Sequence, residues 1–415
     1  MSPPQHVLIV GAGLAGPCLA LSLARNNIPS TIFEIRSGPS SAGGSITLGP
    51  NALHILDKYA GIYHAITQTG FTYQYMGAYA EDGEKFGDIK VGEDHSIQGR
   101  YPAIRIMRSA LQAHLLDAVK QHPGSITLKY DAHINRIQET SDGVSIHFND
   151  NTVAYGDILI GADGVHSKVR EHVLGDTASS PTFNQLCIVN GFLPTSAAKI
   201  PNPSFSFPAF MFTRNGMFMA IPVDAKAEQL AWAIVMPTTE DHTRAEWHAL
   251  ERSGELARKA KAEYDDILVQ PVRSLLDSAD DKSAKIWPVY SIGDIRTWHT
   301  DRICLIGDAA HAMPPNGLGS SLAFEDAAIL TRFLIETDDS SSSLRGIFQN
   351  FERLRRARIT QVREGAKVGT AFSTRTGALG WWLKRWGFRL YFWFKSGVLE
   401  HNKESTYDVD NVLLE

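Results

Sequence analysis

A glycine-rich turn that follows an apolar segment restricts the folds open to this chain more than any other feature. Residues 6–10 (HVLIV) have the composition of a short buried strand, and Gly11, Gly13 and Gly16 follow with the spacing G-x-G-x-x-G. The first glycine permits a tight turn, the second lets a pyrophosphate approach the backbone, and the third lets helix and strand pack closely. We therefore expect a helix over 17–26, which would begin a Rossmann-type βαβ unit.

The second strand of this unit is expected over 31–34, and it ends in Glu34, 18 residues after Gly16. A carboxylate in that place accepts hydrogen bonds from the ribose hydroxyls of a dinucleotide. Ala15 inside the turn and Arg36 just beyond the strand complete the first group of cofactor-binding candidates. Arg36 either meets the extra phosphate of NADPH or lies in a solvated loop. These residues alone leave NAD and FAD open as the nucleotide.

Two further segments have a buried strand that runs into glycine and aspartate. They are 157–170 (DILIGADGVHSKVR), which contains Asp163, and 302–315 (RICLIGDAAHAMPP), which contains Asp308. Each segment alone is weak evidence. All three glycine-containing segments in this order indicate one large cofactor that a single domain holds at both ends, and hence an enzyme.

With these segments the chain resembles the class A flavin-dependent monooxygenases, the para-hydroxybenzoate-hydroxylase-like family. The resemblance covers about 1–175 and 285–365 well and the intervening sheet only in outline. It implies FAD as the cofactor and NADPH or NADH as the reductant. In the family, reduced flavin and O2 form a C4a-hydroperoxyflavin that passes one oxygen atom to an electron-rich substrate. The cofactor carries the difficult chemistry, so no catalytic side chain is assigned.

The resemblance also implies which residues contact the cofactor. The G-D segment meets the ribityl chain and phosphates, the D-G segment serves both FAD and NAD(P)H, and an arginine precedes a helix. A loop at 43–51 passes close to the flavin, and backbone amides at 317–321 approach its isoalloxazine ring. The candidates are Gly44, Ser45, Arg108, Asp163, Asp308, Gly319, Ser320 and Ser321. Arg170 is either a cofactor contact or a plain surface or salt-bridge residue. His311 is expected to be a structural cap after the G-D turn, with a proton shuttle as the alternative.

The pattern changes between about 183 and 237, where helical periodicity disappears and β-rich segments dominate. Asn215-Gly216 between two apolar runs predicts a hairpin. We predict an α/β fold in which a Rossmann-type FAD-binding domain carries an inserted β-sheet substrate domain and C-terminal helices. The expected ranges are 1–70, 100–182 and 285–370 for the FAD-binding domain, 71–99 and 183–284 for the substrate sheet, and 371–415 for a C-terminal helical segment.

Members of the family that hydroxylate phenols use an arginine and a tyrosine of the substrate sheet. On a loose alignment, Asn190 and Ile221 replace this pair here. Phe212, Met219 and Ile221 would then line an apolar cavity, with Pro315 nearby, and the substrate would be neutral, bulky and hydrophobic, such as an indole, polyketide or terpenoid. The alternative is that half of these side chains face elsewhere, because strand residues alternate.

Three functions remain open at this point. The first is insertion of one oxygen atom from O2 into a small hydrophobic substrate by hydroxylation, epoxidation or Baeyer–Villiger oxidation. The second is a flavin-dependent reductase or dehydrogenase on the same fold, without oxygen transfer. The third is a flavin-binding protein that has lost catalysis.

Charge and cysteine usage give no support to a nucleic-acid-binding protein or to a cysteine-based metal site. A net charge of −5 gives no reason to expect nucleic acid as a partner, and three dispersed cysteines have no metal-binding spacing. No signal peptide is evident, so we expect a cytoplasmic protein. The aromatic stretch 378–397 is interrupted by basic residues, which predicts a helix docked on the core or, alternatively, a weak peripheral membrane contact. The oligomeric state stays open.

Overall fold

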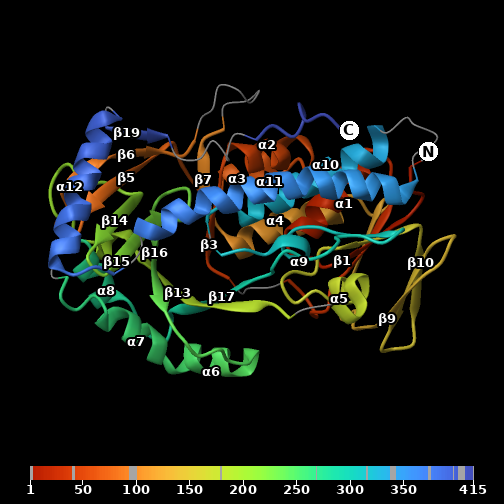
Figure 1. Ribbon diagram of the computed structural model, residues 1–415, viewed down its shortest axis with the longest axis horizontal. Helices are drawn as coiled ribbons and strands as arrows, with labels where there is room; N and C mark the ends of the chain where they lie inside the picture. Colours follow the sequence, from red (N-terminus) through yellow and green to blue (C-terminus); the bar gives the residue numbers. More distant parts are fainter. Residues whose placement is uncertain are drawn as a thin grey trace.

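The computed structural model describes residues 3–39, 43–92, 101–177, 180–267, 269–314, 316–336, 343–372, 375–395, 397–400 and 407–414. Within these ranges the strands form four sheets. A parallel sheet with helices packed on it occupies one side of the molecule, and a larger mixed sheet occupies the other (Figure 1). The predicted α/β fold with two different sheets is therefore present.

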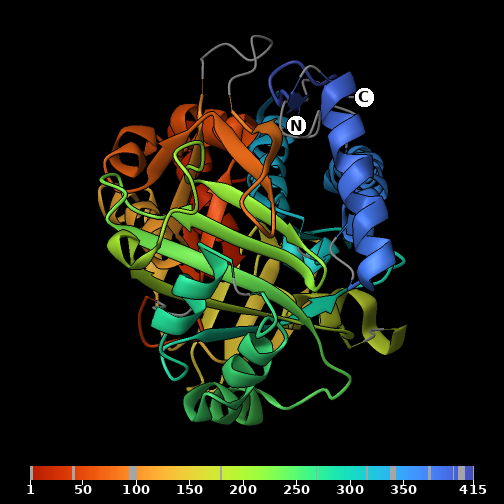
Figure 2. The ribbon, with the colours of Figure 1, turned by 90° about the vertical axis from the view of Figure 1, so that its left-hand side faces the viewer.

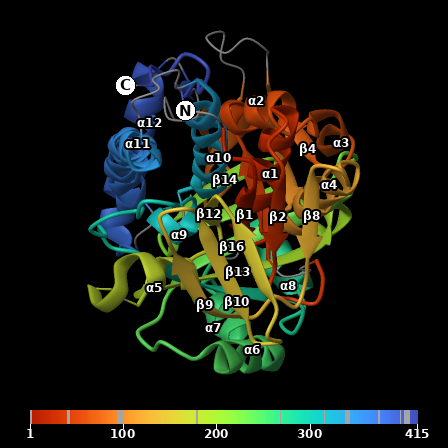
Figure 3. The same cartoon turned by 90° about the vertical axis from the view of Figure 1, so that its right-hand side faces the viewer.

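The parallel sheet holds the predicted βαβ unit. Its strand order is β18-β12-β1-β2-β8, and the strands are β1 (Val7–Val10), β2 (Ser30–Phe33), β8 (Ile126–Lys129), β12 (Ile158–Gly161) and β18 (Ile303–Leu305). Helix α1 (Ala15–Arg25) packs on β1 and β2 and against α10 (Gly319–Glu336) (Figure 3). Strands β1, β2, β12 and β18 are buried along their whole length, as expected for a parallel sheet between helices. This arrangement places the carboxyl ends of β1, β12 and β18 beside the glycine turn.

Two smaller sheets flank the parallel one. Strands β9 (Ile134–Glu139), β10 (Val144–Phe148) and β11 (Val153–Gly156) form an antiparallel meander. Strand β7 (Ala103–Met107) lies between β3 (Ser45–Leu48) and β4 (Phe71–Tyr73), and both pairings are antiparallel. We call this second group the small sheet. It brings Gly44, the residue before β3, next to Asn190 of the large sheet.

The large sheet has the order β17-β13-β16-β15-β14-β5-β6-β19. Its strands are β5 (Tyr75–Ala80), β6 (Lys85–Lys90), β13 (Thr182–Pro194), β14 (Ala209–Thr213), β15 (Gly216–Pro222), β16 (Gln229–Pro237), β17 (Lys285–Ser291) and β19 (Val398–Glu400). Asn190 lies opposite Ala233, which lies opposite Met219, which lies opposite Phe210. Because directly opposed residues share a face, these four side chains lie on one side of the sheet.

The remaining helices surround these sheets. They are α2 (Pro50–Lys58), α3 (Tyr63–Thr67), α4 (Arg108–Lys120), α5 (Lys168–Leu174), α6 (Arg244–Ser253), α7 (Glu255–Ala262), α8 (Val272–Ser278), α9 (Asp308–His311), α11 (Leu344–Phe372) and α12 (Ala378–Phe394), with 3₁₀ turns η1 (Gly175–Thr177) and η2 (Thr195–Ala197). Residues of α7 and α8 share a hydrophobic cluster with the face of the large sheet that carries Trp232 and Phe218. The opposite face carries Asn190 and Met219, two of the predicted substrate contacts.

The structure moves several predicted boundaries. Residues 285–291 were expected in the FAD-binding domain, but β17 pairs with β13 and belongs to the large sheet. Residues 71–73 were expected in the substrate sheet, but β4 pairs with β7 in the small sheet. The C-terminal segment was expected to be helical, but it also contains β19, which pairs with β6. These pairings join residues far apart in the chain, which local patterns do not reveal. The division into domains otherwise stays a prediction.

The predicted hairpin is present with its turn shifted by one residue. Thr213 pairs with Gly216, so Arg214 and Asn215 form the two-residue loop between β14 and β15. Gly216 has φ +129 and begins β15 instead of occupying the turn. Glycine is still required there, because a residue that has a side chain rarely adopts this backbone conformation.

Helix α12 is docked on the face of the large sheet that carries Met219 (Figures 1 and 2). Trp381, Phe388 and Phe392 are buried in one cluster with strand residues, and the ring centroids of Phe212 and Phe388 are 4.4 Å apart. This confirms the predicted docking. The other side of the helix exposes large apolar side chains, namely Leu379, Trp382, Leu383, Trp386, Leu390, Tyr391, Trp393 and Phe394. Among the described residues, no helix is both long and apolar enough to span a bilayer.

A buried ionic network joins α10 and α11. The Arg355 guanidinium donates to Asp326 Oδ1 at 2.7 Å and pairs with Glu325 Oε2 at 2.9 Å, and all three side chains are fully buried. Arg358 also binds Glu325, and the Tyr407 ring lies under both arginines. Buried charges are tolerated only when they are paired in this way. The network therefore fixes α10, whose first turn faces the site described below.

We predict that Arg355→Met destabilises the protein strongly, because it leaves two buried carboxylates without their shared cation. The free energy of unfolding should fall by about 3–5 kcal/mol. Arg345→Met, on the same helix, removes an exposed arginine that pairs with exposed Asp301, and it should change the free energy by less than about 1 kcal/mol. Urea unfolding followed by circular dichroism measures both. Equal effects of the two variants would contradict the assigned role of the network.

Candidate active site

The three glycine-containing segments converge, and the backbone approaches are tight. A Cβ on Gly11, whose φ is +109, would lie 2.4 Å from the Ala162 oxygen, and a Cβ on Gly16 would lie 2.0 Å from the Gly11 oxygen. Gly11 and Gly16 are therefore needed for the fold itself. Gly13 differs, because the nearest atom to its Cβ position is Arg108 Nη2 at 3.7 Å. The backbone at Gly13 is open on the side where a pyrophosphate would approach.

Glu34 lies directly beside this turn and is buried. Its Oε2 accepts from the Ala12 N–H at 2.9 Å, and its Oε1 accepts from the Arg36 backbone and guanidinium, both at 3.1 Å. The Arg36 side chain is about half exposed, so the structure is compatible with both roles that the sequence left open for it. Ala15 is the first residue of α1 and is buried, so any contact that it makes with a cofactor would come from its backbone. Glu34 thus has the position expected of a ribose-binding carboxylate.

Arg108 connects the glycine turn with the other segments. Its backbone N–H donates to the Gly44 oxygen at 3.0 Å, and its side chain lies against the Cβ position of Gly43 at 3.1 Å. Burial lowers the pKa of the Arg108 guanidinium, while the carboxylate of Asp308 opposes this shift. Arg108 is therefore within electrostatic reach of Asp308, 200 residues away in the chain. The structure brings these predicted residues together around one space.

Asp163 supports the D-G segment from within. Its carboxylate accepts from the Ser167 hydroxyl and from the backbone N–H groups of Lys168 and Val169 at 2.8 and 3.2 Å. These bonds cap α5 and fix the loop that carries Gly164. In this arrangement Asp163 shapes the cofactor side of the loop, and its carboxylate is already bonded to the chain.

Arg170 is buried, so it is not the ordinary surface residue that the sequence left open. Its guanidinium donates to the Ala309 oxygen at 3.0 Å and to the Val165 oxygen at 2.6 Å. It therefore ties the D-G segment directly to the G-D segment. Both acceptors are backbone oxygens, so the contact depends on the path of the chain and not on the side chains of those segments.

The G-D turn is held by Asp326 of α10. Gly307 has φ +60, and its N–H donates to Asp326 Oδ2 at 2.7 Å. The His311 ring lies 2.7 Å from the same oxygen, which supports the expected structural role of this histidine. Asp308 keeps access to solvent at the start of α9. Desolvation raises the pKa of Asp308, whereas His311 and Arg108 lower it.

The first turn of α10 offers backbone N–H groups. The first helical hydrogen bond runs from Leu322 N to the Leu318 oxygen, which leaves the preceding amides without a partner in the helix. A Cβ on Gly319 would meet nothing within 4 Å, so there is room for a planar ring close to the backbone. Ser320 is partly exposed, but Ser321 is fully buried, so any contact from Ser321 would come from its backbone. Pro315, a predicted substrate contact, lies outside the described residues.

The substrate candidates of the large sheet face the loop that was predicted to lie near the flavin. Asn190 Oδ1 lies 3.1 Å from the Cβ position of Gly44, and it has no hydrogen-bond partner among the described residues. Met219 and Ile221 lie on the same face of the sheet as Asn190. Phe212 lies farther along this face, where α12 covers it. The registers of β13, β16, β15 and β14 therefore place all four predicted residues on one side of the sheet, and the alternative that half of them face elsewhere does not apply.

Sequence reasoning missed two polar residues of the small sheet, Arg105 and Tyr73. Arg105 Nε donates to Ser45 Oγ at 2.9 Å, and Arg105 Nη1 donates to Thr47 Oγ1 at 2.9 Å. The Tyr73 hydroxyl lies 3.2 Å from Thr47 Oγ1. The available signal was an arginine inside the apolar strand AIRIM, where a charge needs a reason to be present.

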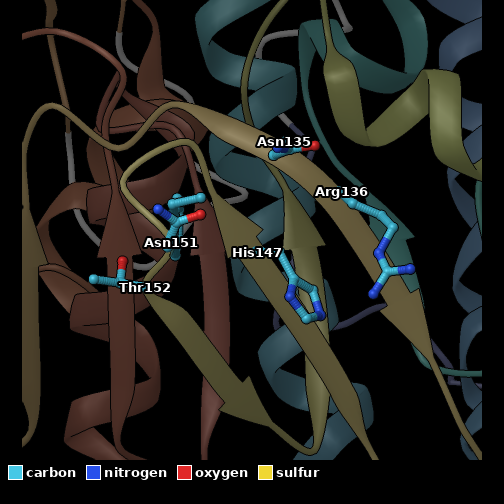
Figure 4. A pocket seen from close by; sticks show the side chains of 6 residues that line it. Asn135, Arg136, His147, Asn151 and Thr152 are labelled. Atoms are coloured by element: carbon cyan, nitrogen blue, oxygen red, sulfur yellow. The ribbon is translucent and has the colours of Figure 1, made fainter.

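A polar depression of about 240 Å³ lies elsewhere, on the meander (Figure 4). Its lining residues come from β9, β10 and the turn that follows, and they are Asn135, Arg136, His147, Phe148, Asn151 and Thr152. None of them belongs to the converging glycine-containing segments. We therefore do not assign the reaction to this depression.

We predict that Gly13→Ala weakens FAD binding without destabilising the apoprotein. The added methyl group would meet no protein atom closer than 3.7 Å, but it would lie where the pyrophosphate is expected. The dissociation constant for FAD should rise about tenfold or more, which corresponds to about 1.4 kcal/mol. Gly11→Ala should lower the melting temperature of the apoprotein, since its methyl group would clash with Ala162. Gly124→Ala, in open space, is the control and should change neither. Flavin fluorescence titration and thermal unfolding measure the two quantities. A Gly13→Ala protein with normal FAD affinity would contradict the placement of the pyrophosphate.

Comparison with known proteins agrees with this geometry. The family described as "FAD binding domain" matches residues 5–365. The 6-hydroxynicotinate 3-monooxygenase of Pseudomonas fluorescens is 27% identical over 366 residues, which cover 87% of this chain and 90% of that protein. Salicylate hydroxylase of Pseudomonas putida is 26% identical over 395 residues, which cover 90% of this chain and 87% of that protein.

Solved structures share the fold over almost the whole chain. A substrate complex of salicylate hydroxylase has a TM-score of 0.75 at 21% identity and covers 98% of this chain and 97% of its own. Klebsiella pneumoniae HpxO with FAD and uric acid has a TM-score of 0.74 at 22% identity, with 93% of each chain covered. The turn at Gly13, the buried Glu34 and the closeness of Arg108 to Asp308 fit the cofactor that the family carries. The predicted family, fold and cofactor are confirmed: the chain belongs to the FAD-binding-domain family and is an FAD-dependent flavoprotein monooxygenase.

Proposed function

We propose that this enzyme hydroxylates a small aromatic substrate with NAD(P)H and O2. The observation that carries the proposal is that two parts of the protein, which we call walls, lie close together where the flavin is expected. One wall is the small sheet, which begins at Ser45 directly after Gly44. The other wall is the face of the large sheet with Asn190, Met219 and Ile221. The aromatic substrates named for the relatives, which are 6-hydroxynicotinate, 3-amino-4-hydroxybenzoate and salicylate, support this choice.

The cofactor would be held by the residues around the glycine turn. We propose that the backbone at Gly13 and the α1 N-terminus face the pyrophosphate, that Glu34 accepts from the ribose, and that Arg108 and Asp308 contact the phosphates and ribityl chain. When bound, FAD supplies the redox centre that NAD(P)H reduces and that activates O2. The unbonded amides at the start of α10 would stabilise negative charge that develops on the ring.

The protein's own contribution is then to hold the substrate and to exclude water. The face of Met219, Ile221 and Phe210 is apolar and packs with residues of the small sheet in one cluster. Helix α12 covers its outer part through Phe388 and Phe392. Apolar surroundings of this kind would protect a reactive oxygen species from water while the ring is oxidised.

The FAD-loaded enzyme should transfer one atom of ¹⁸O₂ to an aromatic substrate while NADPH is consumed. Mass spectrometry of the product, with a panel of hydroxybenzoates and hydroxypyridine carboxylates, checks this. In the absence of substrate, NADPH consumption should yield hydrogen peroxide only. An aromatic product that forms with NADPH consumption but contains no ¹⁸O would overturn the proposal in favour of the reductase alternative.

We also propose a weak membrane contact through the exposed side of α12. Its support is the row of exposed aromatic and aliphatic side chains, in particular Trp382, Leu390 and Trp393. Arg385 and Arg389 already pair with Glu84, and Arg385 also pairs with Asp82, so binding to lipid would depend on apolar contact more than on charge.

This contact predicts sedimentation with vesicles that depends little on salt. Full-length protein should sediment in part with phosphatidylcholine vesicles that contain a minor fraction of phosphatidylserine. The triple variant Trp382→Ser, Leu390→Ser, Trp393→Ser should lose this binding, whereas Tyr155→Ser, an exposed aromatic residue of the meander, should keep it. Unchanged sedimentation of the triple variant would refute the contact.

A further inference from the structure

The arginine in the middle of the small sheet has an unusual environment. Arg105 lies on β7, the central strand, and its residue is only 9% exposed. Its two hydrogen bonds go to the hydroxyls of Ser45 and Thr47, which carry no charge. A buried cation normally has an acidic partner, because transfer of an unpaired charge from water is costly. Two neutral hydroxyls do not provide one.

No described carboxylate lies within 4.0 Å of the Arg105 guanidinium, which distinguishes it from the buried arginines of α11. Burial lowers the pKa of Arg105 to about 10, and the one ionisable group that acts against burial is the phenol of Tyr73. Nη2 also has no hydrogen-bond partner among the described residues. The chain therefore keeps a positive charge in a confined place and leaves part of its hydrogen-bonding capacity unused.

The register of the small sheet shows which way Arg105 faces. Thr47 and Phe71 lie directly opposite it on β3 and β4, so these three side chains share one face. Phe71 packs with the cluster that contains Ile221 of the large sheet. On the same face, Arg105 also binds Ser45, the residue predicted to lie beside the flavin. The guanidinium thus lies at the junction of the cofactor loop and the substrate wall.

We propose that Arg105 is the substrate-recognition cation of this enzyme and, with Tyr73 beside it, binds an anionic oxygen of the substrate. Such an oxygen would belong to an aromatic carboxylate or a phenolate, so this inference rests on the proposed function. It also revises the expectation of a neutral substrate. That expectation followed from Asn190 and Ile221, which leave the large sheet without an arginine–tyrosine pair. An arginine and a tyrosine are present on the facing small sheet.

The test is ligand binding to the FAD-loaded enzyme, with aromatic carboxylates and the matching carboxamides as probes. Salicylate with salicylamide, and 6-hydroxynicotinate with 6-hydroxynicotinamide, are two such pairs. Perturbation of the flavin absorption spectrum gives the dissociation constants without turnover. The carboxylate of each pair should bind more tightly than the amide, and Arg105→Met should raise its dissociation constant by about 10- to 100-fold. The dissociation constant of the amide should change by less than about threefold. Arg105→Lys, which keeps the charge, should retain part of the preference.

Controls separate recognition from a structural role. FAD content and melting temperature show whether each variant is folded, and Arg136→Met removes an arginine of the meander and should leave both probes unaffected. Equal weakening of carboxylate and amide by Arg105→Met, or equal affinity of the wild type for both, would overturn the inference. The same holds if no carboxylate binds. These outcomes do not depend on oxygen transfer, so a product without ¹⁸O would refute the proposed hydroxylation and leave the role of Arg105 to the binding data.

Discussion

The arrangement of the cofactor side depends on one buried carboxylate, Asp326. It accepts from the Gly307 N–H, contacts the His311 ring and binds the Arg355 guanidinium. Burial alone would raise the pKa of Asp326, but His311 and Arg355 hold it low, at about 2, so the group remains ionised. A single charge thus fixes the conformation of the G-D turn and the position of α10. Both elements face the place where the flavin is expected, so we expect Asp326 to support the cofactor site through the backbone that it holds in place.

The substrate side depends on how two sheets meet. The small sheet brings Ser45 and Arg105 to the same face, and the large sheet presents Asn190 and Met219 opposite the loop that contains Gly44. Together the two sheets combine an apolar wall with an uncompensated cation. This combination suits a flat ring with one acidic substituent, since the ring is desolvated by aliphatic and aromatic side chains and the acidic group compensates the arginine. A wholly apolar substrate would leave the buried charge unpaired.

Local sequence patterns were sufficient for the parts of the fold that local chemistry determines. The glycine spacing and Glu34 predicted the βαβ unit, and Asn215-Gly216 predicted a hairpin, although its turn lies one residue earlier. Asn190, Met219 and Ile221 share one face because of the register between β13, β16 and β15, which alternation along a single strand does not determine. The pairing of β17 with β13 and the hydrogen bonds of Arg105 to Ser45 and Thr47 join residues 58 or more positions apart, so no local pattern contained them. Local patterns also did not show which side of α12 is buried. The aromatic residues of this helix occur on all of its sides, and only the packing distinguishes the buried side from the exposed one.

The most direct test of this account is a crystal structure of the FAD-loaded enzyme with a bound aromatic carboxylate. We expect the pyrophosphate beside Gly13, the isoalloxazine ring between Ser45 and the first turn of α10, and the carboxylate within hydrogen-bond distance of Arg105. An aromatic ligand that lies between the two sheets but directs its acidic group away from Arg105 would contradict the proposed recognition. A ligand bound outside this space would contradict the assigned active site as a whole.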